Sequence, residues 1–387
     1  MNNFTFENPT KIIFGKGTIQ EIGPEMAKRG VKKTLLVYGR QSIKKNGVFE
    51  QVAQSLRAAG IVWVEFSGIQ SNPLLSKVRE GIALAKAEGV EAVLAVGGGS
   101  VYDSSKAIAA GSVYDGDVWD FFGRRKVAVS ALPIFGVLTI SATGSEMNAL
   151  GVVTNEDAKK KWSLYSPAIY PKVSVIDPSI QATLPADQTA NAAVDIIAHV
   201  MELYFDGSEN NDIMDEYSEG IIRTVIKHGP VLLADPANYE SRAQLAWCAT
   251  LALNGSNAPG RRGGDFASHG IEHALSAWNN IAHGAGLAII FPAWMKYVWK
   301  NNPMAFLRFG EKVFDITSGG EEKRVMAAIT ALQAFFKKMG APLTLREAGY
   351  KKEDLPSIAE IAASLGPVGN KRKLGQEDIL AILELAW

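Results

Sequence analysis

The sequence predicts an α/β N-terminal domain built on a doubly wound parallel sheet, followed by an all-helical C-terminal domain. In the first half, short continuous apolar runs alternate with helical patterns, as in a parallel sheet that is covered on both faces. In the second half, long helical patterns follow one another with almost no strands. The change falls near residue 184, so we expect domains at 1–184 and 185–387.

Each element is placed by the period of its apolar residues. In the first half we expect strands at 34–38, 62–66, 92–96, 128–132, 137–140 and 173–176. The intervening helices are expected at 49–59 and 76–88, with a third starting near residue 100. In the second half we expect helices at 187–205, 213–227, 239–254, 266–278, 284–300, 321–339 and 376–386.

Composition excludes several classes of protein. Lys and Arg together number 40, as do Asp and Glu, so the chain lacks the basic excess of a nucleic-acid-binding protein. No apolar stretch approaches the roughly 18 residues of a membrane span, and the N-terminus lacks the pattern of a signal peptide. The single cysteine excludes a disulfide within the chain. We therefore expect a cytoplasmic protein.

Two residues outside the main patterns are assigned no function. Cys248 lies in an Ala/Leu-rich stretch without basic neighbours, which predicts a buried, inert thiol. His228 precedes Gly229-Pro230 and is expected at a helix end, where its charge would interact favourably with the helix dipole.

A glycine-rich turn, 97–100 (GGGS), follows the strand expected at 92–96 and opens a helix. Three glycines let backbone N–H groups approach an anion without obstruction by a Cβ atom. The helix N-terminus adds a favourable dipole, and Ser100 can cap the helix or bond a phosphate oxygen. The turn is a candidate phosphate-binding loop, with a tight turn that binds nothing as the alternative. It matches neither GxGxxG nor a Walker loop.

A second loop, 39–42 (GRQS), follows the strand expected at 34–38. In dinucleotide-binding folds, an acidic residue at this place bonds the ribose 2′-hydroxyl and repels a 2′-phosphate. This loop contains no acid, and Lys44 and Lys45 follow it closely. If a dinucleotide binds here, the loop favours NADP over NAD. The alternative is an ordinary polar loop.

Four of the five histidines lie in two segments of the helical half. Asp195 and His199 are four residues apart, which places them one turn apart on the same helix face. His269 and His273 share a helix face in the same way, and His283 precedes another expected helix. One carboxylate and three imidazoles can bind a divalent transition metal, iron(II) or zinc, and leave a position open for catalysis. For the Asp195 and His199 pair taken alone, an ordinary helix-surface pair is the alternative.

Together these segments resemble the iron-containing (group III) alcohol dehydrogenase family over essentially the whole chain. The matching segments are Phe6, Pro9, 13–17 (IFGKG), 97–106 (GGGSVYDSSK), 142–148 (ATGSEMN), Asp177-Pro178 and the two histidine-bearing segments. The forms at 39–48, 139–148 and 263–277 look like the branch of NADPH-dependent butanol dehydrogenases and aldehyde reductases. Tyr102 and 140–142 depart from the commonest forms of the family, near the wall of the cofactor site.

The resemblance implies a role for each matching residue. Asp195, His199, His269 and His283 correspond to metal ligands. His273 corresponds to a non-ligating catalytic histidine near the nicotinamide that relays protons, with a structural histidine bonded to a neighbour as the alternative. Gly39 stands where NAD-preferring members carry an acid. The residues implied to bind the cofactor are Gly39, Arg40, Gln41, Ser42, Gly97, Gly98, Gly99, Ser100, Asp103, Thr139, Ser141, Thr143, Asn148 and Lys161.

The resemblance also implies the architecture and the reaction. The fold would be a Rossmann-like NADP-binding domain plus a helical metal-binding domain, as in dehydroquinate synthase. The metal, Fe(II) or Zn(II), would polarise the substrate oxygen while hydride passes between NADP(H) and a primary alcohol or aldehyde. The partners would be this small-molecule substrate and a second copy of the chain in a homodimer.

Two other functions are compatible with parts of the pattern. A dehydroquinate-synthase-like lyase would need a cluster of Lys and Arg for a phosphorylated acidic substrate, and Arg261-Arg262 is the candidate pair. A non-catalytic nucleotide-binding module would not need four aligned metal ligands.

Overall fold

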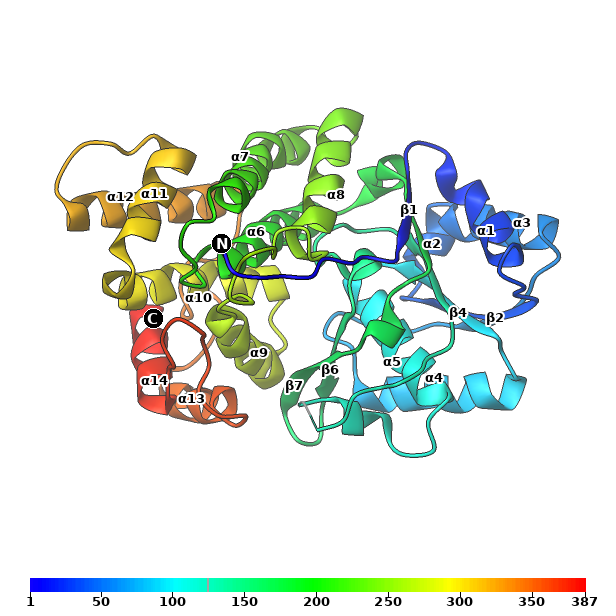
Figure 1. Ribbon diagram of the computed structural model, residues 1–387. Helices are drawn as coiled ribbons and strands as arrows, with labels where there is room; N and C mark the ends of the chain where they lie inside the picture. Colours follow the sequence, from blue (N-terminus) through cyan, green and yellow to red (C-terminus); the bar gives the residue numbers. More distant parts are fainter. Residues whose placement is uncertain (124) are drawn as a thin grey trace. The chain divides into compact units, whose positions relative to one another are not determined.

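The computed structural model describes residues 1–123 and 125–387 (Figure 1). The chain forms two compact units. The α/β unit comprises Glu7–Leu184 with Pro236–Thr250. The helical unit comprises Met1–Phe6, Pro185–Asp235 and Leu251–Trp387. One boundary between the units falls at Leu184, where the sequence pattern changes. Each unit is nevertheless discontinuous in the chain, because segment 1–6 belongs to the helical unit and segment 236–250 to the α/β unit.

Six parallel strands form the central sheet of the α/β unit. They are β1 (Lys11–Phe14), β2 (Lys33–Tyr38), β3 (Val62–Phe66), β4 (Ala92–Gly97), β5 (Ile134–Leu138) and β8 (Val173–Ile176). Their order across the sheet is β1-β8-β5-β4-β2-β3, and every neighbouring pair is parallel. β6 (Leu150–Asn155) and β7 (Lys160–Tyr165) form a separate antiparallel pair.

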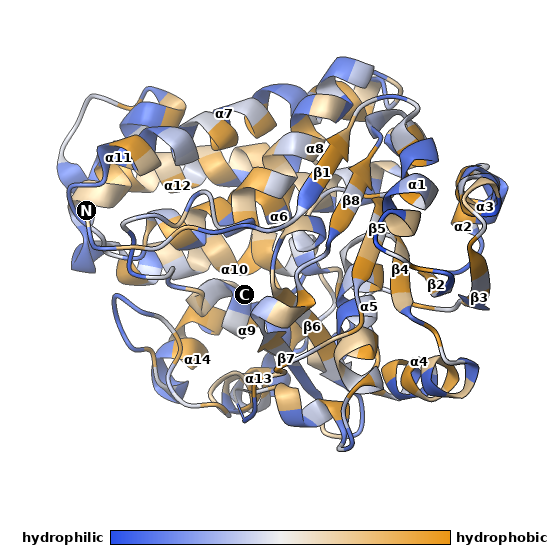
Figure 2. Cartoon of the chain, turned by 45° about the vertical axis from the view of Figure 1, so that its right-hand side comes forward, coloured by the Kyte–Doolittle hydropathy of each residue, from blue (hydrophilic) through white to orange (hydrophobic). Residues whose placement is uncertain are grey.

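Helices cover both faces of this sheet and create two apolar cores. Along β4, Val93 and Ala95 belong to one core and Leu94 and Val96 to the other, as the two-residue period of a strand requires. Because both faces are buried in the middle of the sheet, the central strands β4 and β5 are continuously apolar (Figure 2). The helices are α1 (Ile22–Ala27), α2 (Ser42–Lys45), α3 (Val48–Ala58), α4 (Leu75–Glu88) and α5 (Gly99–Ser112).

The structure confirms most of the expected strands and corrects one. Residues 128–132 form no strand, because Val129 is 93 % exposed and the sheet resumes only at Ile134. The strand expected at 137–140 overlaps only the last two residues of β5, which begins at Ile134. The sequence pattern did not predict β1 or the β6–β7 pair. β1 lies at the edge of the sheet, and β7 begins with two lysines, so neither is a continuous apolar run.

The C-terminal half of the chain contains the helices expected from the periodic patterns and two more α-helices, α11 and α13. α6 packs against α7 and α10, and α10 packs against α9 (Figure 1). The helices of this half of the chain are α6 (Ala186–Tyr204), α7 (Asp212–Ala234), α8 (Tyr239–Leu253), α9 (Ala267–Asn279), α10 (His283–Val298), α11 (Pro303–Phe314), α12 (Glu321–Lys338), α13 (Leu355–Ala362) and α14 (Gln376–Leu385).

Two segments belong to a unit other than the one expected from their position in the chain. Most of α8 joins the α/β unit, where Thr250 donates a hydrogen bond of 2.6 Å to the buried Glu146. The ring of Trp247 meets that of Phe14 at 5.9 Å. Conversely, the N-terminal amine donates to the carbonyl of Asn210, which anchors segment 1–6 on the helical unit.

The two residues that were assigned no function have different outcomes. Cys248 is buried, as expected, and burial raises the pKa of its thiol to about 12. His228 was expected at a helix end, but α7 continues through it to Ala234 with Pro230 inside the helix. Across the described residues, no helix is both long and apolar enough to cross a membrane.

Candidate active site

Helix α6 carries the first two residues of the histidine cluster. Asp195 and His199 lie one turn apart, and both are buried because nearly all of α6 after its first turn is enclosed. Their spacing therefore produces the shared face expected from the sequence, but this face points into the protein. The surface-pair alternative for these two residues is wrong.

Helices α9 and α10 bring the other two members. His269 lies in the first turn of α9, and His283 is the first residue of α10. Gly284 allows α10 to approach α6 closely: a Cβ at this position would lie 2.1 Å from the backbone oxygen of Asn191. The close packing of the two helices places His283 next to Asp195.

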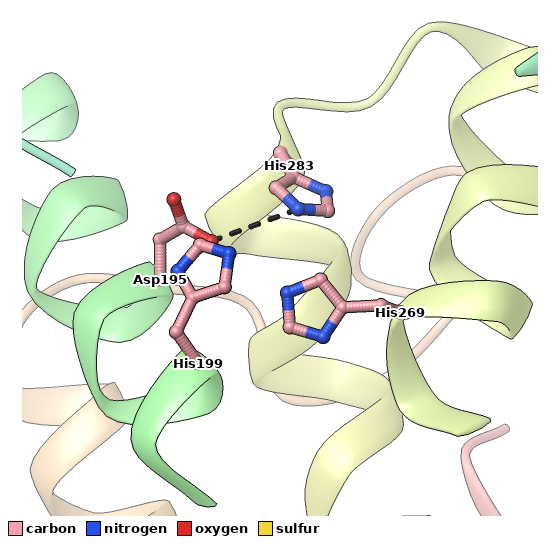
Figure 3. Close-up of side chains that lie close together, drawn as sticks. All are labelled: Asp195, His199, His269 and His283. Atoms are coloured by element: carbon pink, nitrogen blue, oxygen red, sulfur yellow. Dashed lines mark ion pairs between the residues drawn. The ribbon is translucent and has the colours of Figure 1, made fainter. Parts of the chain in front are cut away.

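The four side chains converge on one point (Figure 3). One ligand atom from each of Asp195, His199, His269 and His283 lies within 4.8 Å of all the others. Asp195 Oδ1 is 3.5 Å from His199 Nδ1 and 3.6 Å from His283 Nε2. The ring of His269 lies 4.7 Å from that of His199 and 5.2 Å from that of His283.

The donor atoms of this cluster fit a metal ion. Asp195 Oδ1, His199 Nδ1 and His269 Nε2 are buried and make no hydrogen bond within the described part of the chain. Buried polar atoms are normally paired, so an unpaired Asp195 Oδ1 and an unpaired His269 Nε2 in one cluster indicate a missing partner. Burial lowers the pKa of His199 to about 3, which leaves a neutral imidazole with a lone pair to donate.

His273 lies beside the cluster rather than in it. Its ring is 5.5 Å from that of His283 and 6.5 Å from that of His269, and it is half-buried. It could form a second set of donors with Glu272 and His283. A half-buried imidazole next to the four converging side chains can exchange protons with solvent.

Two buried glutamates near the cluster were missed by the sequence analysis. Glu202 contacts the ring of His269, and Glu272 contacts the ring of His283. A signal for Glu202 existed, since it lies seven residues after Asp195 and three after His199, on the same face of α6. Glu272 has the same spacing, three residues after His269 on α9, but for both glutamates the histidine partner lies on another helix and is shown only by the structure.

The α/β unit gathers the residues expected to bind the cofactor at one edge of its sheet. β2 pairs with β4 and β4 with β5, so the loops that follow these strands, at 39–42, 97–100 and 139–148, start side by side. The chain runs outward from β2 to β3 on one side and from β4 to β5 on the other. The strand order therefore reverses between β2 and β4. Doubly wound sheets bind their ligands at such a reversal, beyond the carboxyl ends of the strands.

The glycines of the 97–100 turn are required by packing against the loop after β5. A Cβ on Gly98 would lie 2.0 Å from Ile140 Cγ2, and one on Gly99 would lie 2.5 Å from Thr143 Oγ1. Gly98 is the N-cap of α5, so the first N–H groups of a fourteen-residue helix lie at this turn. This geometry is compatible both with an anion-binding loop and with a tight turn that binds nothing.

A buried lysine that was not anticipated, Lys106, holds the 139–148 loop on α5. Its ammonium donates to Ser145 Oγ at 2.8 Å, to Asn148 Oδ1 at 2.9 Å and to the carbonyl of Leu150 at 2.6 Å. Ser145 in turn donates to Asp103. Burial lowers the pKa of Lys106 to about 7. Asp103 and Asn148 therefore shape this loop through hydrogen bonds within the protein.

The remaining cofactor candidates lie in three settings. Arg40 and Gln41 are exposed beyond β2, and Ser42 is the first residue of α2. The hydroxyl of Ser141 is buried and accepts a hydrogen bond of 2.8 Å from Gln181. Lys161 is buried on β7.

A carboxylate from another strand lies next to the region after β2, which the sequence alone does not show. Glu65 on β3 accepts hydrogen bonds from Lys44 at 2.8 Å and from Tyr38 at 2.6 Å. The Lys44 ammonium therefore adds no net positive charge to this region, because the Glu65 carboxylate neutralises it. Lys45 is exposed.

The arginine pair considered for a lyase is used elsewhere. Arg261 is buried, lies 3.0 Å from Asp215, and donates hydrogen bonds to Ser218 and to the carbonyls of Met214 and Asn257. These contacts occupy the guanidinium within the protein. The structure thus removes one of the two cations that the lyase alternative required.

Comparison with known proteins agrees with this site. Residues 9–178 match the family described as iron-containing alcohol dehydrogenase, and residues 189–387 match the family's C-terminal part. The chain is 42 % identical to "Probable NADH-dependent butanol dehydrogenase 1" of Bacillus subtilis, over 99 % of both chains. It is 36 % identical to the NADPH-dependent aldehyde reductase YqhD of Escherichia coli, over 92 % of both.

A solved structure shows the same fold. The crystal structure of NADH-dependent butanol dehydrogenase A from Thermotoga maritima superimposes with a TM-score of 0.98 at 53 % identity, covering 100 % of this chain and 99 % of the other. The fold, the donor cluster and the family matches lead to the same conclusion. The chain is a metal-dependent alcohol and aldehyde oxidoreductase and belongs to the iron-containing alcohol dehydrogenase family.

Proposed function

We propose that the protein transfers hydride between NADP(H) and primary alcohols or aldehydes, in the manner of a butanol dehydrogenase or aldehyde reductase. Asp195, His199, His269 and His283 would hold one divalent ion, Fe(II) or Zn(II). The observation that carries the proposal is the convergence of these four ligand atoms, within 4.8 Å of one another, in a family of metal-dependent dehydrogenases.

The ion would supply Lewis acidity toward the substrate oxygen, and the nicotinamide would supply or accept the hydride. The protein's own residues set the conditions for this chemistry. Three neutral imidazoles and one carboxylate leave a net positive charge on a bound dication, which favours an alkoxide over an alcohol. His273 is half-buried beside the cluster and would pass the proton between the substrate oxygen and solvent.

The α/β unit would bind the cofactor. The pyrophosphate would lie on the N-terminus of α5, where Gly97, Gly98 and Gly99 place no side chain beside the backbone N–H groups and Ser100 adds a hydroxyl. The adenosine end would reach the loop after β2. The 139–148 loop and Lys161 would line the rest of the dinucleotide.

A preference for NADP(H) is proposed from the chain's own residues. No carboxylate lies within the 39–42 loop, and Arg40 is exposed there. Relatives named as NADH-dependent and a relative named as NADPH-dependent are both similar to this chain, so their names do not decide the preference. The Lys44–Glu65 pair adds no net charge, which assigns recognition of a 2′-phosphate to Arg40, Gln41 and Ser42.

Gly39→Asp is expected to raise KM for NADPH about tenfold, because a carboxylate repels the 2′-phosphate with roughly 1.4 kcal/mol. A Cβ at Gly39 would lie 3.4 Å from the carbonyl of Ile69, so a side chain meets one tight contact there. Gly39→Asn has the same size without the charge and is the control. Equal NADPH/NADH ratios of kcat/KM in both variants would show that the loop does not recognise the 2′-phosphate.

Butanal-dependent oxidation of NADPH tests the whole assignment. Chelation under anaerobic conditions is expected to abolish turnover, and Fe(II) or Zn(II) to restore it, because substrate activation depends on the ion. Binding of NADPH, followed by its fluorescence, should survive chelation. Full turnover by metal-free protein would contradict the proposal, and turnover of a phosphorylated acid without NADPH consumption would favour the lyase. Metal analysis of anaerobically purified protein distinguishes iron from zinc.

Location and assembly complete the proposal. We place the enzyme in the cytoplasm, because its only cysteine is 6 % exposed and the chain cannot form an internal disulfide. A homodimer is proposed from the family resemblance, and light scattering of the purified protein measures it. The expected partner is a small-molecule substrate, not a nucleic acid or a membrane.

A further inference from the structure

We propose that Glu202 and Glu272 are positioning residues of the metal centre. Each carboxylate accepts a hydrogen bond from Nδ1 of one ligand histidine and so turns the Nε2 atom of that ring toward the ion. The proposal rests on the proposed metal centre, and neither glutamate belongs to the four ligands named for it.

Glu202 orients His269. It lies on α6 and is fully buried. Its Oε1 atom is 2.8 Å from His269 Nδ1 and also accepts the backbone N–H of His269 at 3.0 Å. One oxygen therefore fixes both the ring and the start of α9. The opposite ring atom, Nε2, is one of the buried atoms without a hydrogen bond in the described structure.

Glu272 orients His283. It lies on α9 and is also fully buried. Its Oε2 atom bonds His283 Nδ1, while its Oε1 atom accepts the hydroxyl of Ser276. The helix that carries His283 leaves room for this carboxylate, since a Cβ on Gly286 would lie 2.7 Å from Glu272 Cγ. The Nε2 atom of His283 then faces Asp195 Oδ1.

The tautomer of each ring follows from these contacts. A neutral imidazole has one N–H donor and one acceptor nitrogen. A carboxylate at Nδ1 places the proton there and leaves the Nε2 lone pair for the ion. Without the carboxylate, the ring could rotate or take the other tautomer, and Nε2 would lose its fixed direction.

The same contacts connect three helices in a closed ring. α6 supplies Glu202 to a histidine of α9, α9 supplies Glu272 to a histidine of α10, and His283 of α10 returns to Asp195 of α6. Three carboxylates are thereby buried in one region of the protein. Burying such charges is costly unless they are compensated, and a divalent cation between the three helices would compensate two of the three.

Zinc affinity of the reloaded enzyme, measured by competition with a chromophoric chelator, tests the proposal. Glu202→Gln and Glu272→Gln are each expected to weaken Zn²⁺ binding about 10- to 100-fold. The visible absorption bands of the Co²⁺-substituted protein should shift, because the ring directions change. Ser276→Ala removes one hydrogen bond from Glu272 and should weaken zinc in the same direction by a smaller factor.

Glu219→Gln is the matched control. Glu219 is a fully buried carboxylate of α7 that is bonded to Tyr204 and Arg308, outside the cluster. This variant should lower the unfolding temperature of the metal-free protein and keep wild-type zinc affinity and cobalt bands.

Wild-type zinc affinity and cobalt bands in the Glu202 and Glu272 variants would overturn the proposal and show that these carboxylates serve folding alone. If a glutamine variant does not fold, Ser276→Ala decides the case of Glu272 by the same measurement. A wild-type protein that binds no Zn²⁺ or Co²⁺ would instead refute the metal centre itself, so the two failures are distinguishable.

Discussion

His199→Ala is expected to abolish metal binding and to lower kcat/KM by at least about 1,000-fold. His199 is buried within the cluster and offers one of its four ligand atoms. Its removal breaks the donor set and with it a Lewis-acid contribution of several kcal/mol, of which about 4 kcal/mol corresponds to this factor. Metal content and butanal reduction by NADPH measure the two effects.

Two controls separate this result from general damage. NADPH binding should remain, because the proposed phosphate loop lies in the α/β unit and His199 in the helical unit. His228→Ala, in the same unit but outside the cluster, should keep its metal and its activity. Metal-free His199→Ala protein that still turns over would refute the assignment of the site.

Gly284→Ala is expected to weaken zinc binding and to lower kcat/KM about 100-fold without touching any ligand. The added Cβ would lie 2.1 Å from the oxygen, 2.7 Å from the carbonyl carbon and 2.8 Å from the Cα of Asn191, all of them backbone atoms of α6. Backbone cannot rotate away, so α10 must move and take His283 with it. A displacement of about 1 Å can cost this factor in rate, and the overpacking itself costs roughly 3 kcal/mol.

Gly220→Ala provides the control for this helix glycine. It lies inside α7, and a Cβ there would meet nothing within 4 Å. Because alanine is the better helix former, this variant should be more stable by about 0.5–1 kcal/mol and fully active. Zinc affinity of Gly284→Ala equal to that of the wild type would show that the close approach of α10 to α6 is not needed for the site.

The four candidate metal ligands show how much residue spacing can predict. Asp195 and His199 share a turn of one helix, so their common face follows from the sequence alone. That His269 and His283 join them depends on α9 and α10 packing next to α6, which no local pattern encodes. The chemistry of one carboxylate and three imidazoles made the grouping a reasonable hypothesis, and the structure brings the four side chains together.

The sheet edge with the expected cofactor loops also combines features visible in the sequence with features that only the fold determines. The glycine-rich turn after β4 is visible in the sequence, because it lies between an apolar strand and a helix. Its neighbours are decided by strand order: β2 and β5 flank β4, although β3 and α4 lie between β2 and β4 along the chain. The network that joins Lys106 to Ser145 and Asn148 exists only in the folded protein.

The strand expected at 128–132 marks a limit of local patterns. An apolar run predicts burial only if a partner covers it, and Val129 has none of its side chain enclosed by the sheet, being 93 % exposed. The hydrogen-bonded strand begins instead at Ile134, where β4 and β8 lie on either side.

By itself, the sequence determined the α/β and helical halves, the phosphate-loop candidate, the two histidine segments and the resemblance to a dehydrogenase family. These features depend on local periodicity and on residue type, which are properties of short stretches of chain. Only the tertiary structure decided which carboxylates contact His269 and His283, where α8 belongs, and that Glu65 neutralises Lys44. Such contacts join residues far apart in the sequence, and their energies depend on burial, which is established only when the whole chain packs.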